Sequence, residues 1–96
     1  MKYAKKVVLV SRTCYEDSHA SSLLDMIKQG VQLFCVTGEY CDAWEEAMDW
    51  MCIDPEVELG FVVTSRHPGE DVEEVMAFAR EWKKEEIGED VTLLEI

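Results

Sequence analysis

Four short apolar runs alternate with three segments of helical periodicity, and this alternation constrains the fold more than any other feature. The apolar runs are KKVVLVSR (5–12), VQLFCVTG (31–38), VELGFVV (57–63) and VTLLEI (91–96). Runs of about four to eight apolar residues are typical of buried strands. Strands that alternate with helices through short connections form parallel sheets with right-handed crossovers. We therefore expect one domain over residues 1–96, a three-layer α/β/α fold with a mainly parallel four-stranded sheet (β-α-β-α-β-α-β) in a flavodoxin-like or Rossmann-like order such as 2-1-3-4.

The first two helical segments carry their own start and stop signals. Residues 17–29 repeat apolar side chains at the i, i+3, i+4, i+7 spacing of one helix face, and Gly30 follows as the residue that ends the helix. The second helix is expected to start near Asp42, with Glu45 three residues later as in a capping box, and to run to about residue 53. Pro55 then stops it.

The third helical segment follows the stretch TSRHPGE (64–70), which we interpret as a strand-to-helix corner. Pro68 stands where the first helical residue would be, a position that proline favours. Ser65 or His67 would satisfy free N–H groups at the helix start, and Glu70 would complement the helix dipole. This interpretation makes the stretch a turn rather than an active site.

The body of this third helix is amphipathic. Its buried stripe is expected to comprise Val72, Val75, Met76 and Ala79. Lys83 and Lys84 are expected in its last turn, where cations are favoured. Three helices cannot cover both faces of a sheet equally, so one face should carry a single helix. That uneven cover favours a partner or a homodimer.

The charge of the chain is strongly unbalanced, with 21 Asp and Glu against nine Lys and Arg and a net charge of −12. Such a surface repels nucleic-acid phosphates and anionic lipid heads, so we expect no nucleic acid and no membrane as a partner. It would attract a basic protein. The N-terminal apolar run is too short for a signal peptide, and we expect a cytoplasmic protein.

Chemistry-bearing side chains collect at the expected carboxyl ends of the strands, where open parallel sheets bind ligands. The candidates for catalysis there are Cys14, Ser65 and His67. No glycine-rich phosphate motif occurs, and acids occupy the helix starts that an anion would need. The four cysteines include no Cys-x-x-Cys pair and only two histidines are present, so we expect free thiols, no cofactor and no metal.

The second helix carries the surface that we expect to be functional. The side chains expected to face the sheet are Cys41, Trp44, Ala47, Met48 and Met51. The acids expected on the opposite side are Asp42, Glu45, Glu46 and Asp49, with Trp50 beside them. Trp50 is either an exposed anchor for a partner or packs under the 53–57 loop against Ile53 or Val57, and both placements stay open.

Three segments resemble a family of short acidic bacterial proteins of unknown function. They are LFCVTGEYCDAWEEAMDW (33–50), TSRHPGE (64–70) and FAREW (78–82). The recurring features are LFCV, a Gly, a Cys, WE, MD, a TS-x-HP-x-E corner and an FA-x-x-W tail. The resemblance covers most of the chain from residue 31 and implies no particular activity.

A second resemblance is to the barstar-type ribonuclease inhibitors. GEYCDAWEEAMDW (38–50) is similar to the start of their inhibitory acidic helix, and residues 70–96 are similar to their last helix and strand. The resemblance implies a basic enzyme as partner, with Glu39, Asp42 and Asp49 as the counterparts of the inhibitory acids. This chain departs from the pattern in an added strand and in an acid-to-tryptophan spacing that is one residue shorter.

These observations favour a non-enzymatic, acidic binding protein of the immunity or inhibitor type. The residues expected to bind its basic partner are Glu39, Asp42, Glu46, Asp49 and Trp50. The alternatives are a small-molecule-binding or thiol-dependent enzyme with its site at the carboxyl ends of the strands, and a homodimeric structural subunit.

Overall fold

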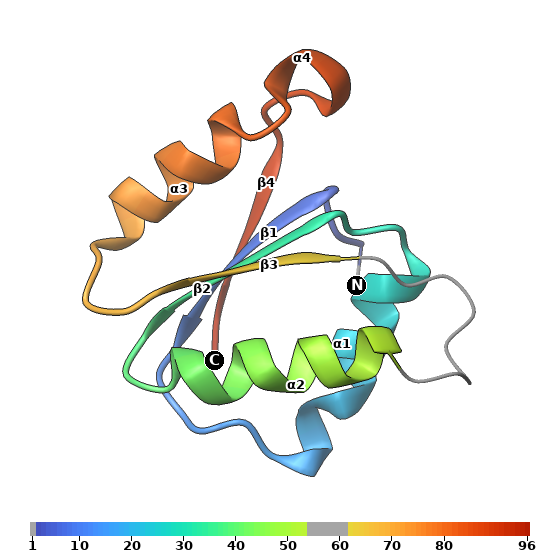
Figure 1. Cartoon of the computed structure of the whole chain (residues 1–96), viewed down its shortest axis with the longest axis vertical. Coiled ribbons are helices and arrows are strands. Elements are labelled where there is room, and N and C mark those ends of the chain that lie inside the picture. Colours follow the sequence, from blue (N-terminus) through green and yellow to red (C-terminus); the bar gives the residue numbers. More distant parts are fainter. Residues whose placement is uncertain (1, 54–61) are drawn as a thin grey trace.

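Strands and helices alternate along the chain in the computed structural model, which describes residues 2–53 and 62–96 (Figure 1). The strands are β1 (Lys6–Ser11), β2 (Leu33–Gly38), β3 (Val63–His67) and β4 (Val91–Glu95). The helices are α1 (Ala20–Lys28), α2 (Cys41–Ile53), α3 (Val72–Glu81) and the short α4 (Lys84–Ile87), and a 3₁₀ turn η1 (Asp17–His19) precedes α1.

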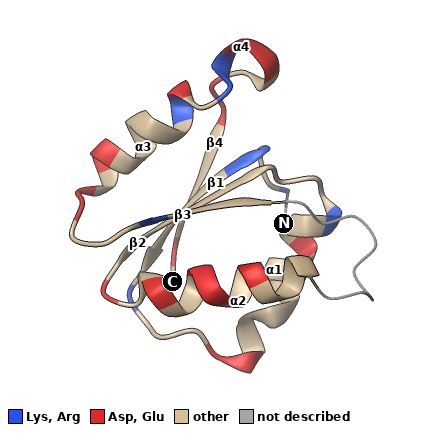
Figure 2. Ribbon diagram, in the orientation of Figure 1, with Lys and Arg blue, Asp and Glu red and all other residues tan. Residues whose placement is uncertain are grey.

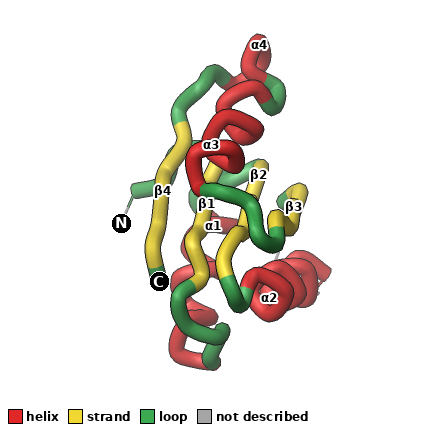
Figure 3. The backbone as a smooth tube through the Cα atoms, turned by 90° about the vertical axis from the view of Figure 1, so that its left-hand side faces the viewer, coloured by secondary structure: helices red, strands yellow, loops and turns green. Residues whose placement is uncertain are grey.

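The strands form one parallel sheet in the order β3-β2-β1-β4, which Figure 3 shows from the side. Val8 of β1 lies opposite Cys35 of β2 and Leu93 of β4. The expected α/β fold with a parallel four-stranded sheet is confirmed, and the order is Rossmann-like. The example order 2-1-3-4 is wrong, because β1 to β3 follow one another in one direction and β4 returns to the far side of β1.

The two faces of the sheet are covered unequally, as expected. α1 and α2 lie together on one face and α3 lies on the other (Figure 1). Val7 and Leu9 point toward α1 and α2, where the main core contains Phe34, Trp44 and Met48. Val8 points the opposite way, into a smaller cluster with Cys35, Val75 and Ala79. The alternation of side chains along β1 therefore supplies both cores.

Lys6 is a fully buried cation at the start of β1. Its Nζ donates a hydrogen bond of 2.8 Å to the carbonyl oxygen of Arg80, in the last turn of α3. A cation is favoured at this end of a helix, because the unpaired carbonyls there carry partial negative charge. The contact ties the C-terminal end of α3 to the sheet.

The third strand lies later in the chain than the predicted 57–63. Residues 57–61 are outside the described ranges, Val62 is buried but not in the strand, and β3 covers Val63–His67. The first half of the expected 64–70 corner is therefore strand. β3 is an edge strand that pairs only with β2 among the described strands, so polar residues are tolerated along it.

The start of α3 also differs from the prediction. Pro68 does not occupy the first helical position, because it lies in the turn after β3, and Asp71 is the N-cap of a helix that begins at Val72. Lys83 and Lys84 are not in its last turn. The helix ends at Glu81, Lys83 adopts a left-handed φ of 45°, and Lys84 begins α4.

The ends of α1 and α2 are close to those expected. Gly30 has a φ of 85° and follows α1 directly after its C-cap, as predicted. Its N–H donates to the carbonyl of Ile27, and the N–H of Val31 donates to that of Met26, which is the Schellman pattern. α2 begins at Cys41, one residue before the predicted Asp42, and ends at Ile53 as expected.

Candidate functional site

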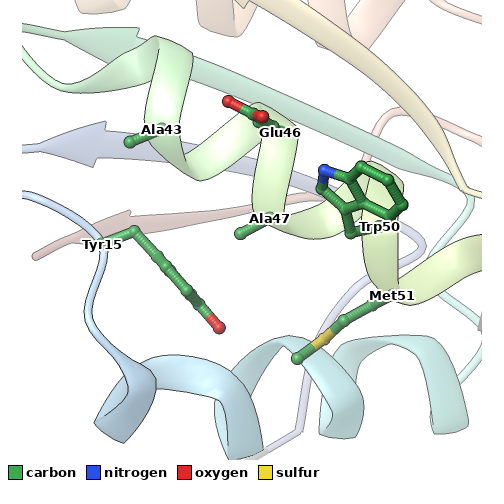
Figure 4. A pocket seen from close by; sticks show the side chains of 6 residues that line it. All are labelled: Tyr15, Ala43, Glu46, Ala47, Trp50 and Met51. Carbon is green, nitrogen blue, oxygen red and sulfur yellow. The ribbon is translucent and has the colours of Figure 1, made fainter.

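A shallow groove runs along the flank of α2 that faces away from β3. It has a volume of about 440 Å³ and is lined by Tyr15, Ala43, Glu46, Ala47, Trp50 and Met51 (Figure 4). Five of these residues come from α2 at spacings of three and four, so they form one continuous strip of the helix surface. Tyr15 reaches the groove from the loop between β1 and η1.

Trp50 is exposed on the rim of this groove. Its exposed fraction is 64%, and that of the neighbouring Ile53 is 68%, so Trp50 is not packed under Ile53. Val57, the other predicted neighbour, lies outside the described residues. The sequence left open whether Trp50 is exposed or packs under the 53–57 loop. In the described part of the chain, Trp50 is exposed.

Trp44, six residues earlier on the same helix, is fully buried and structural. Its indole Nε1 donates a hydrogen bond of 2.9 Å to the carbonyl of Thr13. Tyr15 packs edge-on against it at 5.3 Å between ring centroids, and His19 lies at 4.7 Å. This aromatic cluster holds Tyr15 in place, so the wall of the groove opposite α2 is fixed by packing.

Two further contacts surround Tyr15 and its neighbour His19. Burial and the Asp17 carboxylate raise the pKa of the Tyr15 phenol, which keeps it neutral near pH 7. His19 Nδ1 accepts a hydrogen bond of 3.1 Å from the backbone N–H of Glu16. Tyr15 therefore supplies an aromatic ring with a neutral phenol to the groove.

The acids of α2 divide between two flanks of the helix, whose red bands are visible in Figure 2. Asp42 pairs with Arg66 at 3.3 Å, and Asp49 Oδ1 accepts a hydrogen bond of 2.7 Å from Thr64 Oγ1, so both turn toward β3. Glu46 borders the groove and makes no ion pair within residues 2–53 and 62–96. The structure brings Glu46 and Trp50 together, but Asp42 and Asp49 already have partners in the chain.

Glu39 lies apart from that groove, in a second hollow at the carboxyl edge of the sheet. This hollow has a volume of about 400 Å³ and is lined by Val10, Thr37, Gly38, Glu39, Gly69, Glu70, Asp71 and Val72. Ligands of open parallel sheets bind at this edge. Three carboxylates line the hollow, and they disfavour a phosphate or another anion there.

Gly38 is required where β1 and β2 approach each other at this edge. It has a φ of 101°, and a Cβ added to it would lie 2.6 Å from the carbonyl oxygen of Ser11. The Ser11 hydroxyl donates to the carbonyl of Thr37 and accepts from the N–H of Tyr40, at 2.8 and 3.1 Å. These bonds join the end of β1 to the turn that starts α2.

Ser65, His67 and Glu70 form a continuous hydrogen-bonded line. His67 Nε2 lies 2.7 Å from Ser65 Oγ, and Nδ1 lies 2.7 Å from Glu70 Oε2. With a proton on Nδ1 to donate to the carboxylate, Nε2 accepts from the serine hydroxyl. The expectation that Ser65 or His67 caps α3 is wrong, because β3 places both side chains toward each other and toward the face of the sheet that α3 covers.

The surroundings of this line favour a structural role. His67 is nearly buried, and its ring lies 5.0 Å from that of Phe78 on α3. The Thr37 hydroxyl bonds to the carbonyls of His67 and Glu70, at 2.9 and 2.8 Å. These contacts fasten the turn between β3 and α3. The acid-lined hollow reaches Glu70 but is not lined by Ser65 or His67.

Cys14 is exposed in the loop after β1 and does not join His67. The preceding residue, Thr13, contacts Trp44 on the α2 side of the sheet, whereas His67 contacts Phe78 on the α3 side. Among the other thiols, burial raises the pKa of Cys41 and Cys52, and it raises the pKa of Cys35 to about 12. The three buried or half-buried thiols are therefore poor nucleophiles near neutral pH.

No group of three or more His, Cys, Asp and Glu side chains in the described ranges could hold a metal ion. The two histidines lie on opposite faces of the sheet, His19 against Trp44 and His67 against Phe78. In the same ranges, no helix is long and apolar enough to cross a membrane.

Several residues at these sites were missed from the sequence. Ala47 and Met51, which are expected in the sheet-facing stripe, do pack against the main core, and they also line the groove. The sequence patterns gave no role to Ala43 or Tyr15. The available signal was the pair of alanines four residues apart, which leaves room beside Trp50. Glu70 was read only as a complement to the helix dipole, although its spacing of three from His67 allows a side-chain contact.

The fold and the groove define a class: a small three-layer α/β protein with a Rossmann-like parallel sheet and an acidic helix beside an apolar groove. The family model described as "Domain of unknown function (DUF7684)" matches residues 1–96, and the chain belongs to this family. The expected membership of an uncharacterised family is thus confirmed. No curated protein and no solved structure matches the chain.

Proposed function

We propose that this protein is a non-catalytic, cytoplasmic binding protein of the immunity or inhibitor type, which binds a basic protein partner through α2. The observation that carries the proposal is the 64% exposure of Trp50 beside the carboxylate of Glu46, on the rim of a groove. An exposed tryptophan has a large apolar surface that only a partner would remove from water. Tryptophan is also enriched among the residues that dominate binding energy.

The charge of the chain supports a basic partner. The net charge of −12 would steer a cationic protein toward the surface and raise the rate of association. Asp42, Glu46 and Asp49 lie along the exposed side of α2, and the Asp42 side chain stays 74% exposed despite its contact with Arg66. Exposed ion pairs are weak, so Asp42 remains available to a partner. The resemblance of residues 38–50 to the acidic helix of barstar-type inhibitors supports the same proposal.

Affinity capture at low salt with two variants and two controls tests this proposal. Trp50→Ala and Glu46→Gln should each reduce the amount of captured partner by roughly tenfold, which corresponds to about 1.4 kcal/mol. Phe78→Ala removes an exposed aromatic side chain from the opposite face, and Glu85→Gln removes a charge from α4. Neither control should reduce capture. A partner whose capture does not change with Trp50→Ala would contradict the proposal.

A second candidate function, nucleophilic catalysis near the ends of the strands, is favoured by the line from Ser65 through His67 to Glu70. A serine whose hydroxyl donates to a carboxylate-bound histidine can act as a nucleophile. Labelling with a fluorophosphonate probe tests this function, with Ser65→Ala as the control. The binding function predicts no labelling of Ser65, and the catalytic function predicts labelling that His67→Gln abolishes.

A homodimer is a third candidate, and exposed apolar side chains on the less covered face favour it. Leu93 of β4 and Phe78 of α3 are both 43% exposed there. Sedimentation equilibrium over a wide concentration range distinguishes a monomer from a homodimer. A dimer that Leu93→Lys dissociates would support this candidate, and a monomer at every concentration would exclude it.

A further inference from the structure

The walls of the α2 groove combine apolar, aromatic and anionic groups in one place. Ala43 and Ala47 form a low apolar strip along the helix, and Met51 continues it at one end (Figure 4). Trp50 and Tyr15 supply aromatic rings, and Glu46 supplies one carboxylate. Among the residues that the structure describes, no lysine or arginine lines the groove. A ligand that satisfies all three kinds of wall needs an apolar stem and a positively charged end.

We propose that the groove binds an arginine side chain of the partner, an inference that rests on the proposed function. The methylene groups of the arginine lie along the strip of Ala43 and Ala47. Its planar guanidinium stacks on the exposed indole of Trp50 and pairs with Glu46. Arginine meets both needs because its guanidinium stacks on aromatic faces and offers paired N–H donors to a carboxylate.

α2 carries four acids, and their contacts together with their distance from the groove explain why Glu46 receives this charge, since Glu45 does not line the groove. Asp42 already contacts Arg66, and Asp49 already accepts a hydrogen bond from Thr64. Glu46 has no ion-pair partner in residues 2–53 and 62–96, and it is the α2 acid that borders the groove. A cation placed there gains a carboxylate without breaking a contact within the chain.

A chemical distinction separates arginine from other occupants. Lysine carries a compact, strongly hydrated charge that stacks less well on an indole. A purely apolar side chain would leave Glu46 beside a dehydrated surface without a partner, which is unfavourable. A carboxylate or phosphate group would be repelled by Glu46 and by the net charge of −12.

The test uses the intact, ¹⁵N-labelled protein and three capped peptides, acetyl-Ser-Ala-X-Ala-Ser-amide, in which X is arginine, lysine or citrulline. Citrulline keeps the shape of arginine and removes its charge. In ¹H–¹⁵N correlation spectra, the arginine peptide should shift the indole N–H of Trp50 and the amides of Ala43 and Ala47 in a saturable manner. The lysine and citrulline peptides should each bind at least roughly fivefold more weakly than the arginine peptide.

Variants of the protein locate the effect. Glu46→Gln and Trp50→Leu should each weaken binding of the arginine peptide by roughly fivefold or more. Glu45→Gln, an acid next to Glu46 that does not line the groove, should leave it unchanged. Equal binding of the citrulline peptide, or shifts spread over acidic residues distant from the groove, would overturn the inference.

The two proposals fail in different ways. If capture of a protein partner depends on Trp50 but the arginine peptide does not shift the groove, the arginine inference fails and the proposed function stands. If the arginine peptide binds as described but no partner is captured in a Trp50-dependent manner, the proposed function fails and the groove remains a site for a guanidinium group.

Discussion

Trp44 and Trp50 show how two identical side chains on one helix lie in opposite environments. Trp44 is enclosed by the core, with its indole N–H bonded to Thr13, whereas Trp50 is 64% exposed. Helical geometry is the cause, since six residues at about 100° each rotate Trp50 well away from the buried side. Trp44 therefore contributes to stability, and Trp50 is available for binding.

This contrast predicts opposite results from two substitutions. Trp44→Ala should lower the free energy of unfolding by about 3–5 kcal/mol, because it leaves a large cavity in the core. Trp50→Ala should change it by less than about 0.5 kcal/mol, because the side chain is mostly in water. Urea denaturation followed by circular dichroism measures both. A Trp50→Ala variant that is as unstable as Trp44→Ala would show that Trp50 is packed.

Cys35 predicts a loss of stability at high pH. Burial raises its pKa from 9.0 to about 12, although the nearby Lys6 ammonium acts in the opposite direction. Between these values the unfolded chain has lost the thiol proton and the folded chain retains it. The free energy of unfolding should therefore fall as the pH rises from about 9 toward 12, by up to about 1.4 kcal/mol per pH unit.

Denaturation curves of two variants isolate this contribution. Cys35→Ala should reduce the slope of stability against pH above about pH 9, whereas Ser21→Ala, at an exposed residue that does not titrate, should leave it unchanged. The raised pKa values of Cys41 and Cys52 act in the same direction and remain in both variants. An unaltered slope in Cys35→Ala would contradict the assignment.

The elements with local signals were predictable from the sequence, and β3 was not. Gly30 ends α1 through hydrogen bonds that depend on a left-handed residue, so its position is marked in the sequence. β3 has no apolar run, because it is an edge strand whose polar residues contact α2 on one side and Glu70 on the other. The position of β3 depends on its pairing with β2, in which Thr37 lies opposite His67. Pairing between residues so far apart in the sequence leaves no local sequence pattern.

Gly38 provides a test of how β1 and β2 end. Gly38→Ala should destabilise the protein by about 2–4 kcal/mol, because it combines a φ of 101° with a steric clash against the Ser11 carbonyl. Gly69→Ala is the matched control, with a φ of 72° and open space around the position, and should cost only about 1 kcal/mol. Thermal denaturation of both variants measures the difference. Equal losses would mean that the close approach to Ser11 has no energetic weight.

The whole molecule presents two unlike faces. The α2 side carries the groove with Trp50 and Glu46. The α3 side carries the acid-lined hollow and the hydrogen bonds that join Ser65, His67 and Glu70. The acidic helix and its tryptophan were predictable from residue spacing. The groove was not, because Tyr15 reaches it from a separate loop that only the packing around Trp44 brings close. Glu39 was grouped with the α2 acids by its position in the sequence, but it lines the hollow instead.

The most direct test of a cation-binding α2 face is the rate at which the captured partner associates with the protein at increasing salt. Surface charges are screened over about 10 Å at 0.1 M salt and about 3 Å at 1 M. The association rate should fall by at least tenfold over this range, and Trp50→Ala should mainly speed dissociation. An association rate that does not change with salt, together with a dissociation rate that does not change in Trp50→Ala, would contradict a cation-binding α2 face.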